Sequence, residues 1–292
     1  MKHVLVIGGT GFVGSALACR LAGAGFALTL PSRRPERVRH LSVLPTVRLV
    51  QADVHDEAAL ARLMAGHEAV INLAGILHGD FERVHVALPG KIGRAARKAD
   101  IARLIHVSAL GAAADAPSLY LKSKAAGEAA LRQAYPAATI FRPSVIFGRG
   151  DSFLSLFARL ARLLPIVPLV SPEARFQPVW VEDVVSALAA ALAQPESCGA
   201  TYALCGPRQY TLKELVAYAA RVSGHPRPIV GLPFALSILQ AWLMEFLPNP
   251  PLTRDNVWSM EVPNVCPQGS TLPFGLEATP LEAIAPSYLA GH

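Results

Sequence analysis

The sequence predicts an α/β protein: a doubly wound parallel sheet followed by a smaller C-terminal, substrate-type domain. Short apolar segments alternate with helix-like segments as far as Pro143, and strands that alternate with helices form parallel sheets. Three glycines directly follow the first apolar segment, and the alternation stops after Pro143. We therefore expect a dinucleotide-binding domain over residues 1–150, with a return segment at about 175–195, and a small domain with a tail over 151–292.

Composition excludes several classes of protein. With 52% hydrophobic and 16% charged residues, the 292-residue chain is not intrinsically disordered. No apolar run reaches the ~18 residues of a membrane span, and no interleaving of aromatic and basic residues indicates a nucleic-acid partner. The four cysteines lack zinc-site spacing and disulfide-scaffold density, so we expect reduced thiols in a cytoplasmic protein. The net charge of +6 leaves a solvated basic surface and an acidic partner both open.

Residues 4–7 are apolar without polar alternation, which is typical of a strand buried on both faces. Glycines follow at the spacing G-x-x-G-x-x-G, and apolar residues then recur at every fourth position, as in a helix with one face on a sheet. A glycine turn between strand and helix lets a pyrophosphate approach the helix N-terminus. A purely structural turn is the alternative. The predicted dinucleotide contacts here are Gly8, Thr10, Gly11, Phe12, Val13 and Gly14.

The second strand, residues 26–30, ends at a position that decides between two cofactors. An acidic residue there accepts hydrogen bonds from the adenosine ribose of NAD, whereas arginine matches the 2′-phosphate of NADP. The sequence has Ser32, Arg33 and Arg34 at this point and no acid before Glu36. We predict NADP(H) as the cofactor, with NAD(H) second. A basic loop without a ligand is the alternative.

The following strands, residues 47–51, 70–73 and 104–107, also end in residues suited to a cofactor, with helices between them at 57–65 and 83–98. An aspartate after the third strand can accept a hydrogen bond from the adenine amino group, and small residues after the fourth let a cofactor lie across the strand end. Ligands of parallel sheets bind at these carboxyl ends. The predicted contacts are Asp53, Val54, Leu73, Ala74, Gly75, Val107 and Ser108.

Tyr120 and Lys124 open a helix that is expected to reach about Tyr135. Residues at i and i+4 share one face of a helix. A free tyrosine is only about one part in a thousand ionised at neutral pH, and a lysine ammonium nearby favours the phenolate. Tyr120 can then exchange a proton with a carbonyl or alcohol, while Lys124 holds the nicotinamide ribose. We predict that both residues bind the cofactor and act in catalysis.

Five segments carry a resemblance to a known family: Gly8-Gly9-Thr10-Gly11-Phe12-Val13-Gly14, Asp53-Val54, Asn72-Leu73-Ala74-Gly75, Tyr120-x-x-x-Lys124 and Arg142-Pro143-Ser144-x-x-x-Gly148. Together they resemble the extended short-chain dehydrogenase/reductase superfamily, which implies a Rossmann domain. Residues 118–128, 247–256 and 274–276 are similar to an atypical branch that contains the alpha-subcomplex subunit nine of respiratory complex I and its bacterial relatives. The resemblance adds Pro143, Ser144 and Val145 to the predicted cofactor contacts.

The chain departs from this family just after the fifth strand. Catalytic members carry a Ser or Thr there, which polarises the substrate carbonyl, but the matching position falls on Ala109 or Leu110. Ser108 lies one or two residues early, and a shift of one residue turns a strand side chain to the opposite face. We include Ser108 as a catalytic candidate, with a hydroxyl that satisfies local backbone as the alternative.

The second half of the chain contains three expected helices. Residues 153–164 have a wide apolar face, and Thr211 with Glu214 forms a capping box for a helix that reaches about Ser223. Residues 232–247 are apolar almost all round, so we expect some side chains against the small domain and others, such as Trp242 or Phe246, exposed for a protein or membrane partner; complete burial is the alternative. No histidines have metal-site spacing, and His78 and His85 are expected at the surface.

Three functions are compatible with these residues. The first is an NADP(H)-binding protein that holds the nucleotide for structural or sensing use, or reduces a substrate slowly. The second is a competent NAD(P)-dependent oxidoreductase or sugar-nucleotide epimerase or dehydratase, acting on a small carbonyl compound or a sugar nucleotide through Tyr120 and Lys124. The third is a respiratory-complex accessory or assembly factor, peripheral to the inner membrane through residues 232–247. The missing Ser or Thr favours the first, and the intact Tyr-Lys pair favours the second.

Overall fold

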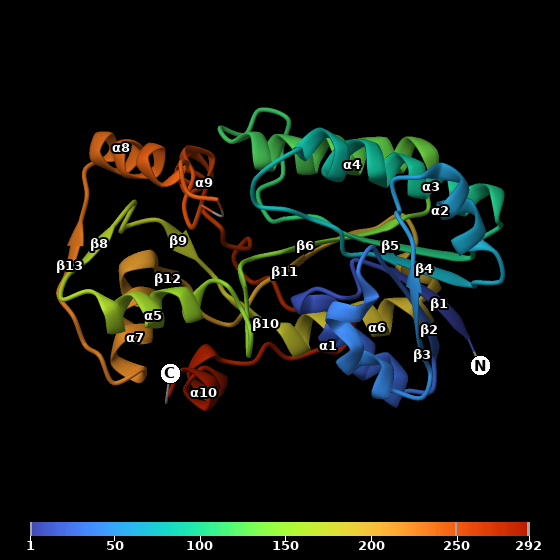
Figure 1. The fold of residues 1–292 in the computed structure, drawn as a ribbon, viewed down its shortest axis with the longest axis horizontal. Coiled ribbons are helices and arrows are strands. Elements are labelled where there is room, and N and C mark those ends of the chain that lie inside the picture. The colour runs from blue at the N-terminus through green and yellow to red at the C-terminus, as the bar shows by residue number, and fades with distance from the viewer. Residues whose placement is uncertain (1, 249, 291–292) are drawn as a thin grey trace.

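The computed structural model describes residues 2–248 and 250–290. Its larger part is built around a seven-stranded parallel sheet (Figure 1). The strand order is β11-β6-β5-β4-β1-β2-β3, so the chain changes direction across the sheet between β1 and β4. The strands are β1 (His3–Ile7), β2 (Ala27–Ser32), β3 (Val47–Gln51), β4 (Ala69–Asn72), β5 (Arg103–Val107), β6 (Thr139–Pro143) and β11 (Thr201–Leu204). The predicted doubly wound sheet is confirmed, although the ends of the two predicted domain ranges, residues 1 and 291–292, lie outside the described residues.

Helices cover both faces of the sheet, which explains the uninterrupted apolar character of β1. Val4 and Val6 pack into the core under α1 (Phe12–Gly23) and α6 (Val181–Ala193). Leu5 and Ile7 pack into the opposite core under α2 (Glu57–Met64), α3 (Leu88–Lys98) and α4 (Leu119–Ala134). Successive side chains of a strand point to opposite faces, so the four apolar residues of β1 are all buried, whereas His3 at its start is exposed. A π-helical turn (Glu82–Ala87) precedes α3 within the predicted helix 83–98.

A smaller group of elements lies beside the sheet, at the left in Figure 1. Its helices are α5 (Leu154–Leu163), α7 (Leu212–Val222), α8 (Phe234–Met244), α9 (Arg254–Ser259), α10 (Leu281–Ile284) and α11 (Pro286–Leu289). Three two-stranded pairs join them: β7 (Ile146–Phe147) with β10 (Val179–Trp180), β9 (Arg175–Phe176) with β12 (Tyr210–Thr211), and β8 (Val167–Leu169) with β13 (Ile229–Gly231). The capping box of Thr211 and Glu214 is present at the start of α7, as predicted.

The helix α8 divides its apolar side chains between interior and surface. Within the helix only Ser237 and Ala241 are fully buried, while Trp242 is 43% exposed and Phe246, just beyond the helix, is 74% exposed. The expected division of this segment is therefore confirmed, and its role in docking stays a prediction. Among the described residues, no helix has the length and apolar character needed to cross a membrane.

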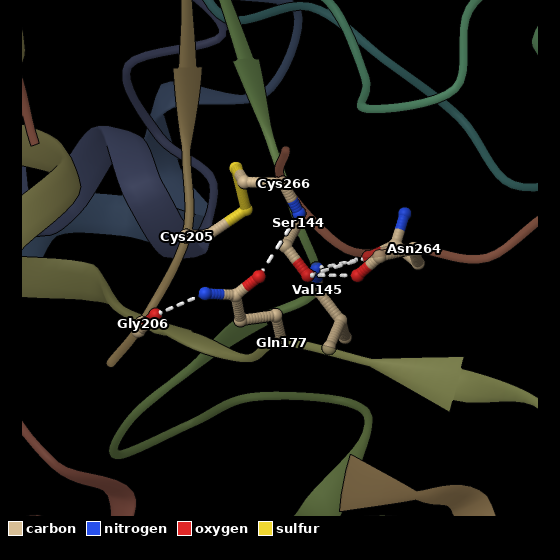
Figure 2. The surroundings of a disulfide bond; sticks show 7 residues. All are labelled: Ser144, Val145, Gln177, Cys205, Gly206, Asn264 and Cys266. Atoms are coloured by element: carbon tan, nitrogen blue, oxygen red, sulfur yellow. Dashed lines mark hydrogen bonds between the residues drawn. A yellow bond between two sulfur atoms is a disulfide. The ribbon is translucent and has the colours of Figure 1, made fainter. Parts of the chain in front are cut away.

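Two of the four cysteines are joined, which contradicts the expectation of four reduced thiols. Cys205, just after β11, forms a disulfide with Cys266 in the tail (Figure 2). The side chain of Gln177 aligns the two segments: its Oε1 accepts from the Cys266 amide at 2.9 Å, and its Nε2 donates to the Gly206 carbonyl at 2.7 Å. The two cysteines are 61 residues apart, so their spacing along the sequence does not indicate that they pair. Cys19 and Cys198 are free and exposed.

Candidate functional site

The turn between β1 and α1 has the shape of a phosphate-binding cradle. Gly8 has φ of +78°, and a Cβ there would lie 2.9 Å from the Leu73 carbonyl carbon. A Cβ on Gly14 would lie 2.5 Å from the Gly8 oxygen, so a side chain at either position displaces backbone. In the part of the chain that the structure describes, no side chain caps the N-terminus of α1 at Gly11. Its free N–H groups and positive dipole end fit an anionic pyrophosphate.

The predicted adenosine contacts lie together at the ends of β2 and β3. Ser32 pairs in register with Gln51, so the residues that follow each strand are neighbours. Arg33 and Arg34 are exposed there, and the Arg34 amide donates to Ser32 Oγ at 3.2 Å. The carboxylate of Asp53 accepts from the His55 amide at 3.0 Å and lies 3.7 Å from the Arg83 guanidinium. Two exposed guanidinium groups next to a hydroxyl suit a phosphate.

A buried polar pair shapes the turn after β4. Asn72 accepts from the Ala74 amide at 3.1 Å and contacts His106 Nδ1 at 3.0 Å through its Nδ2. These bonds set the path of Leu73, Ala74 and Gly75, whose backbone faces Gly8 across the switch point of the sheet. The turn lies where we predicted that the cofactor crosses the strand end.

Tyr120 and Lys124 lie in the first turns of α4 and face the same site. Ser118 caps this helix, and Asp255 from α9 accepts hydrogen bonds from the Leu119 and Tyr120 amides at 2.6 and 3.0 Å. Lys124 Nζ is 5.8 Å from the centre of the Tyr120 ring. Burial raises the pKa of Tyr120 to about 12 and lowers the pKa of Lys124 to about 8, the latter opposed by Glu128. Tyr120 is therefore protonated, as a proton donor must be.

His85 is buried, which contradicts its predicted place at the surface. It is only 2% exposed, its Nε2 accepts from the Ile76 amide at 3.0 Å, and its Nδ1 donates to Ser123 Oγ at 2.9 Å. Ser123 Oγ in turn donates to the Tyr120 carbonyl at 2.7 Å. Burial, and then the charge of Lys124, lower the pKa of His85 to about 3. Through these hydrogen bonds the neutral ring connects the turn after β4 to α4, the helix that carries Tyr120 and Lys124.

Ser108 is buried and has a free hydroxyl. Its Oγ makes no hydrogen bond to any described residue. Ser108 and Tyr120 line the same cavity, together with Ala109 and Leu110, which have no side-chain donor. A buried polar atom without a partner is costly, so the free Oγ suits a ligand oxygen. The alternative role, in which this hydroxyl satisfies local backbone, does not occur in the structure.

The cavity has a volume of about 640 Å³ and lies between the sheet and the smaller group of elements. The predicted contacts Phe12, Val13, Gly75, Val107, Pro143, Ser144 and Val145 all line it. The tail contributes Asn264 to the lining. Figure 2 shows its hydrogen bonds: Asn264 Oδ1 accepts from Ser144 Oγ at 2.6 Å and from the Val145 amide at 2.9 Å. Asn264 and Asp255 were not predicted from the sequence, because their partners are more than a hundred residues away. Gln240 was not predicted either, because its only link to the site is that it lines the cavity.

The described residues contain no cluster of three or more side chains that could hold a metal ion. They do fit a dinucleotide. The glycine cradle, the uncapped N-terminus of α1 and the free hydroxyl of Ser108 follow one another along the carboxyl edge of the sheet. This edge is where ligands of such folds bind.

Comparisons with known proteins agree with this geometry. Residues 4–205 match the model of the NAD dependent epimerase/dehydratase family. The chain is 33% identical to NADH dehydrogenase (ubiquinone) 1 alpha subcomplex subunit 9 of Mus musculus, over 98% of this chain and 79% of that protein. It is 34% identical to a ceramide reductase of Caulobacter vibrioides, over 82% of this chain and 78% of that protein. The solved dTDP-glucose 4,6-dehydratase of Bacillus anthracis, in complex with NAD, shares the fold with a TM-score of 0.69 and 18% identity, over 80% of this chain and 85% of that chain.

Proposed function

The chain belongs to the NAD dependent epimerase/dehydratase family, and from this premise we propose that it binds NADP(H) and reduces a carbonyl compound. The observation that carries the proposal is the pairing of two hydroxyls, Ser108 and Tyr120, on one cavity at the carboxyl edge of the sheet. The similarity to a protein named ceramide reductase favours reduction over epimerisation. Steady-state oxidation of NADPH in the presence of ketones tests the proposal.

Each residue of the site has a part in this reaction. The bound cofactor supplies the hydride. The Tyr120 hydroxyl, held protonated by burial, donates its proton to the carbonyl oxygen. Ser108 Oγ donates a second hydrogen bond to that oxygen as negative charge develops. The Lys124 ammonium would hold the nicotinamide ribose, and its charge favours loss of the tyrosine proton. His85 and Asp255 keep α4 in place against the turn after β4 and against α9.

We expect NADPH to bind at least about tenfold more tightly than NADH. A bidentate contact between arginine and the 2′-phosphate is worth more than ~1.4 kcal/mol, which is one decade in affinity. Isothermal titration calorimetry of the wild type and of Arg33→Glu measures the difference. The variant is expected to lose the preference, because its carboxylate repels the phosphate and accepts from the ribose of NADH. Equal affinities in the wild type would contradict the assignment of Arg33 and Arg34.

The affinity for NADPH is expected to fall about tenfold between pH 7.5 and 9.5. Burial lowers the pKa of Lys124 to about 8, so above that pH the lysine of the free protein is mostly uncharged. It must then take up a proton before it can hold the ribose as an ammonium, which lowers the affinity. Lys124→Arg, which keeps its charge in this range, is the control and should give a flat profile. A flat profile in the wild type would show that Lys124 does not contact the nucleotide.

A second candidate function is that of an accessory subunit that holds NADP(H) without turnover, peripheral to the inner membrane. Two observations favour it: one relative is a subunit of NADH dehydrogenase, and α8 exposes Trp242 and other apolar side chains to solvent. Exposed apolar patches of this kind mark interaction surfaces. Tight NADPH binding with no turnover of any ketone would favour this candidate over the reductase.

A further inference from the structure

The lining of the cavity carries no charged side chain. Among its 34 described residues there is no Asp, Glu, His, Lys or Arg. Diphosphates are normally held by Arg or Lys side chains or by free helix N-termini. Among the helix N-termini that border the cavity, that of α1 is assigned to the cofactor pyrophosphate. Those of α4 and α5 already bind the carboxylates of Asp255 and Asp151, which repel a second anion. A sugar nucleotide therefore finds no partner for its charge in the substrate part of this cavity.

Hydrocarbon side chains instead form most of the cavity wall away from Ser108 and Tyr120. They come from α5, β8 and the segment just after it, and α8 with the segment that follows it; examples are Leu156, Leu160, Leu169, Val170, Met244 and Leu252. These side chains come from several elements and line the same cavity as Ser108 and Tyr120. Apolar ligands gain most of their affinity from leaving water for such surroundings.

Only a few polar atoms are available to position a ligand. Ser108 Oγ and Gln240 Oε1 are both buried without a hydrogen-bond partner among the described residues, and both residues line the cavity. Ser108 lies on the sheet wall and Gln240 on α8. A ligand needs one polar group to satisfy Ser108 and a second one to satisfy Gln240, and the rest of its body can be apolar.

The apolar surroundings continue through α8. Gln240 and Met244 line the cavity, whereas Leu236, Leu239 and Leu243 of the same helix are exposed. The helix thus has hydrocarbon on its inner and outer sides, which explains why its sequence is apolar all round.

We propose that the substrate is a carbonyl compound with a long apolar chain and that a nucleoside diphosphate sugar is not accepted. The position of the carbonyl beside Tyr120 rests on the proposed function, but the apolar character of the cavity does not. Complete burial of one methylene is worth about a fourfold gain in affinity. Dodecan-2-one should therefore bind at least about a hundredfold more tightly than hexan-2-one.

The test measures binding without turnover. Hexan-2-one, dodecan-2-one and UDP-glucose are each titrated into the full chain by calorimetry, with NADP⁺, which has no hydride to give, and without it. The proposal expects strong dependence on chain length and no binding of UDP-glucose. Affinity that is independent of chain length, or UDP-glucose binding more tightly than dodecan-2-one, would overturn it. Chain-length-dependent binding without any NADPH oxidation would refute the reductase and leave the apolar cavity intact.

Single-residue variants test where the alkyl chain of the ligand binds. Leu160→Arg places a charge on the cavity wall and should weaken dodecan-2-one binding more than tenfold. Leu163→Arg, on the same helix but 68% exposed and outside the lining, is the matched control and should bind as the wild type does. Met244→Arg repeats the test from α8, in case the first variant does not fold. Unchanged affinity for dodecan-2-one in a folded Leu160→Arg or Met244→Arg variant would place the alkyl chain of the ligand elsewhere and contradict the proposal.

Discussion

Tyr120→Phe is expected to lower kcat by a factor of about 10² to 10⁴, the usual contribution of a positioned proton donor, while the affinity for NADPH changes less than about twofold. The substitution removes only the hydroxyl. The ring keeps its contacts with Phe81 and His85, at centroid distances of 6.0 and 5.5 Å, so α4 and Lys124 should stay in place. Stopped-flow or steady-state oxidation of NADPH gives kcat, and calorimetry gives the dissociation constant.

Two further variants distinguish the roles of the neighbouring residues. Lys124→Ala should weaken NADPH binding as well as turnover, because it removes the donors to the ribose. Ser108→Ala should lower kcat about 10²- to 10³-fold, the usual cost of losing one donor to a developing oxyanion, with little effect on binding. Full activity in Tyr120→Phe would refute the proposed proton donor. Full activity in Ser108→Ala alone would leave Ser108 without a part in catalysis.

The features that the sequence predicted well depend on local pattern. The burial of β1 on both faces follows from its four consecutive apolar residues, and the cradle at Gly8 and Gly14 follows from their spacing between strand and helix. The pair Tyr120 and Lys124 shares a helix face because 3.6 residues make one turn. In each case the signal lies within about ten residues of chain, so no tertiary information was needed.

The features that were missed depend on contacts between distant segments. The wrong placement of His85 arose because a lone histidine in an amphipathic stretch has no local signal for burial; its partner Ser123 is 38 residues away. Asp255 reaches the Tyr120 amide across 135 residues, and the cysteines of the disulfide are 61 residues apart. Spacing along the chain cannot show such pairs. The return of the tail to the sheet brings the second and third of these pairs together, and the packing of the turn at Glu82–Ala87 against α4 brings the first together.

The same buried histidines make the protein sensitive to acid. His85 and His106 are each about 2% exposed, and burial, with the positive charge of Lys124 second, lowers both pKa values to about 3. In the unfolded chain both titrate near their ordinary value of 6.5. Between pH 6.5 and 3 the unfolded state therefore binds more protons than the folded state, so the free energy of unfolding falls as the pH falls.

The expected loss is a large fraction of a typical protein's stability. Each histidine contributes about 1.4 kcal/mol per pH unit, so at pH 4.5 the two together cost about 5 kcal/mol, against a typical total stability of ~5–15 kcal/mol. Urea unfolding at pH 7 and at pH 4.5 measures the difference. His78→Gln, at an exposed position, should leave this pH dependence unchanged.

The double variant His85→Gln, His106→Gln isolates the two buried rings from the carboxyl groups that also titrate in acid. It is expected to be less stable than the wild type at pH 7, because Gln replaces the bonds to Ile76, Ser123 and Asn72 imperfectly. Its stability should nevertheless fall by about 5 kcal/mol less between pH 7 and 4.5, since a neutral amide has no proton to gain. The slope, and not the absolute stability, is the test. An equal slope in variant and wild type would mean that carboxyl groups, and not these histidines, cause acid unfolding.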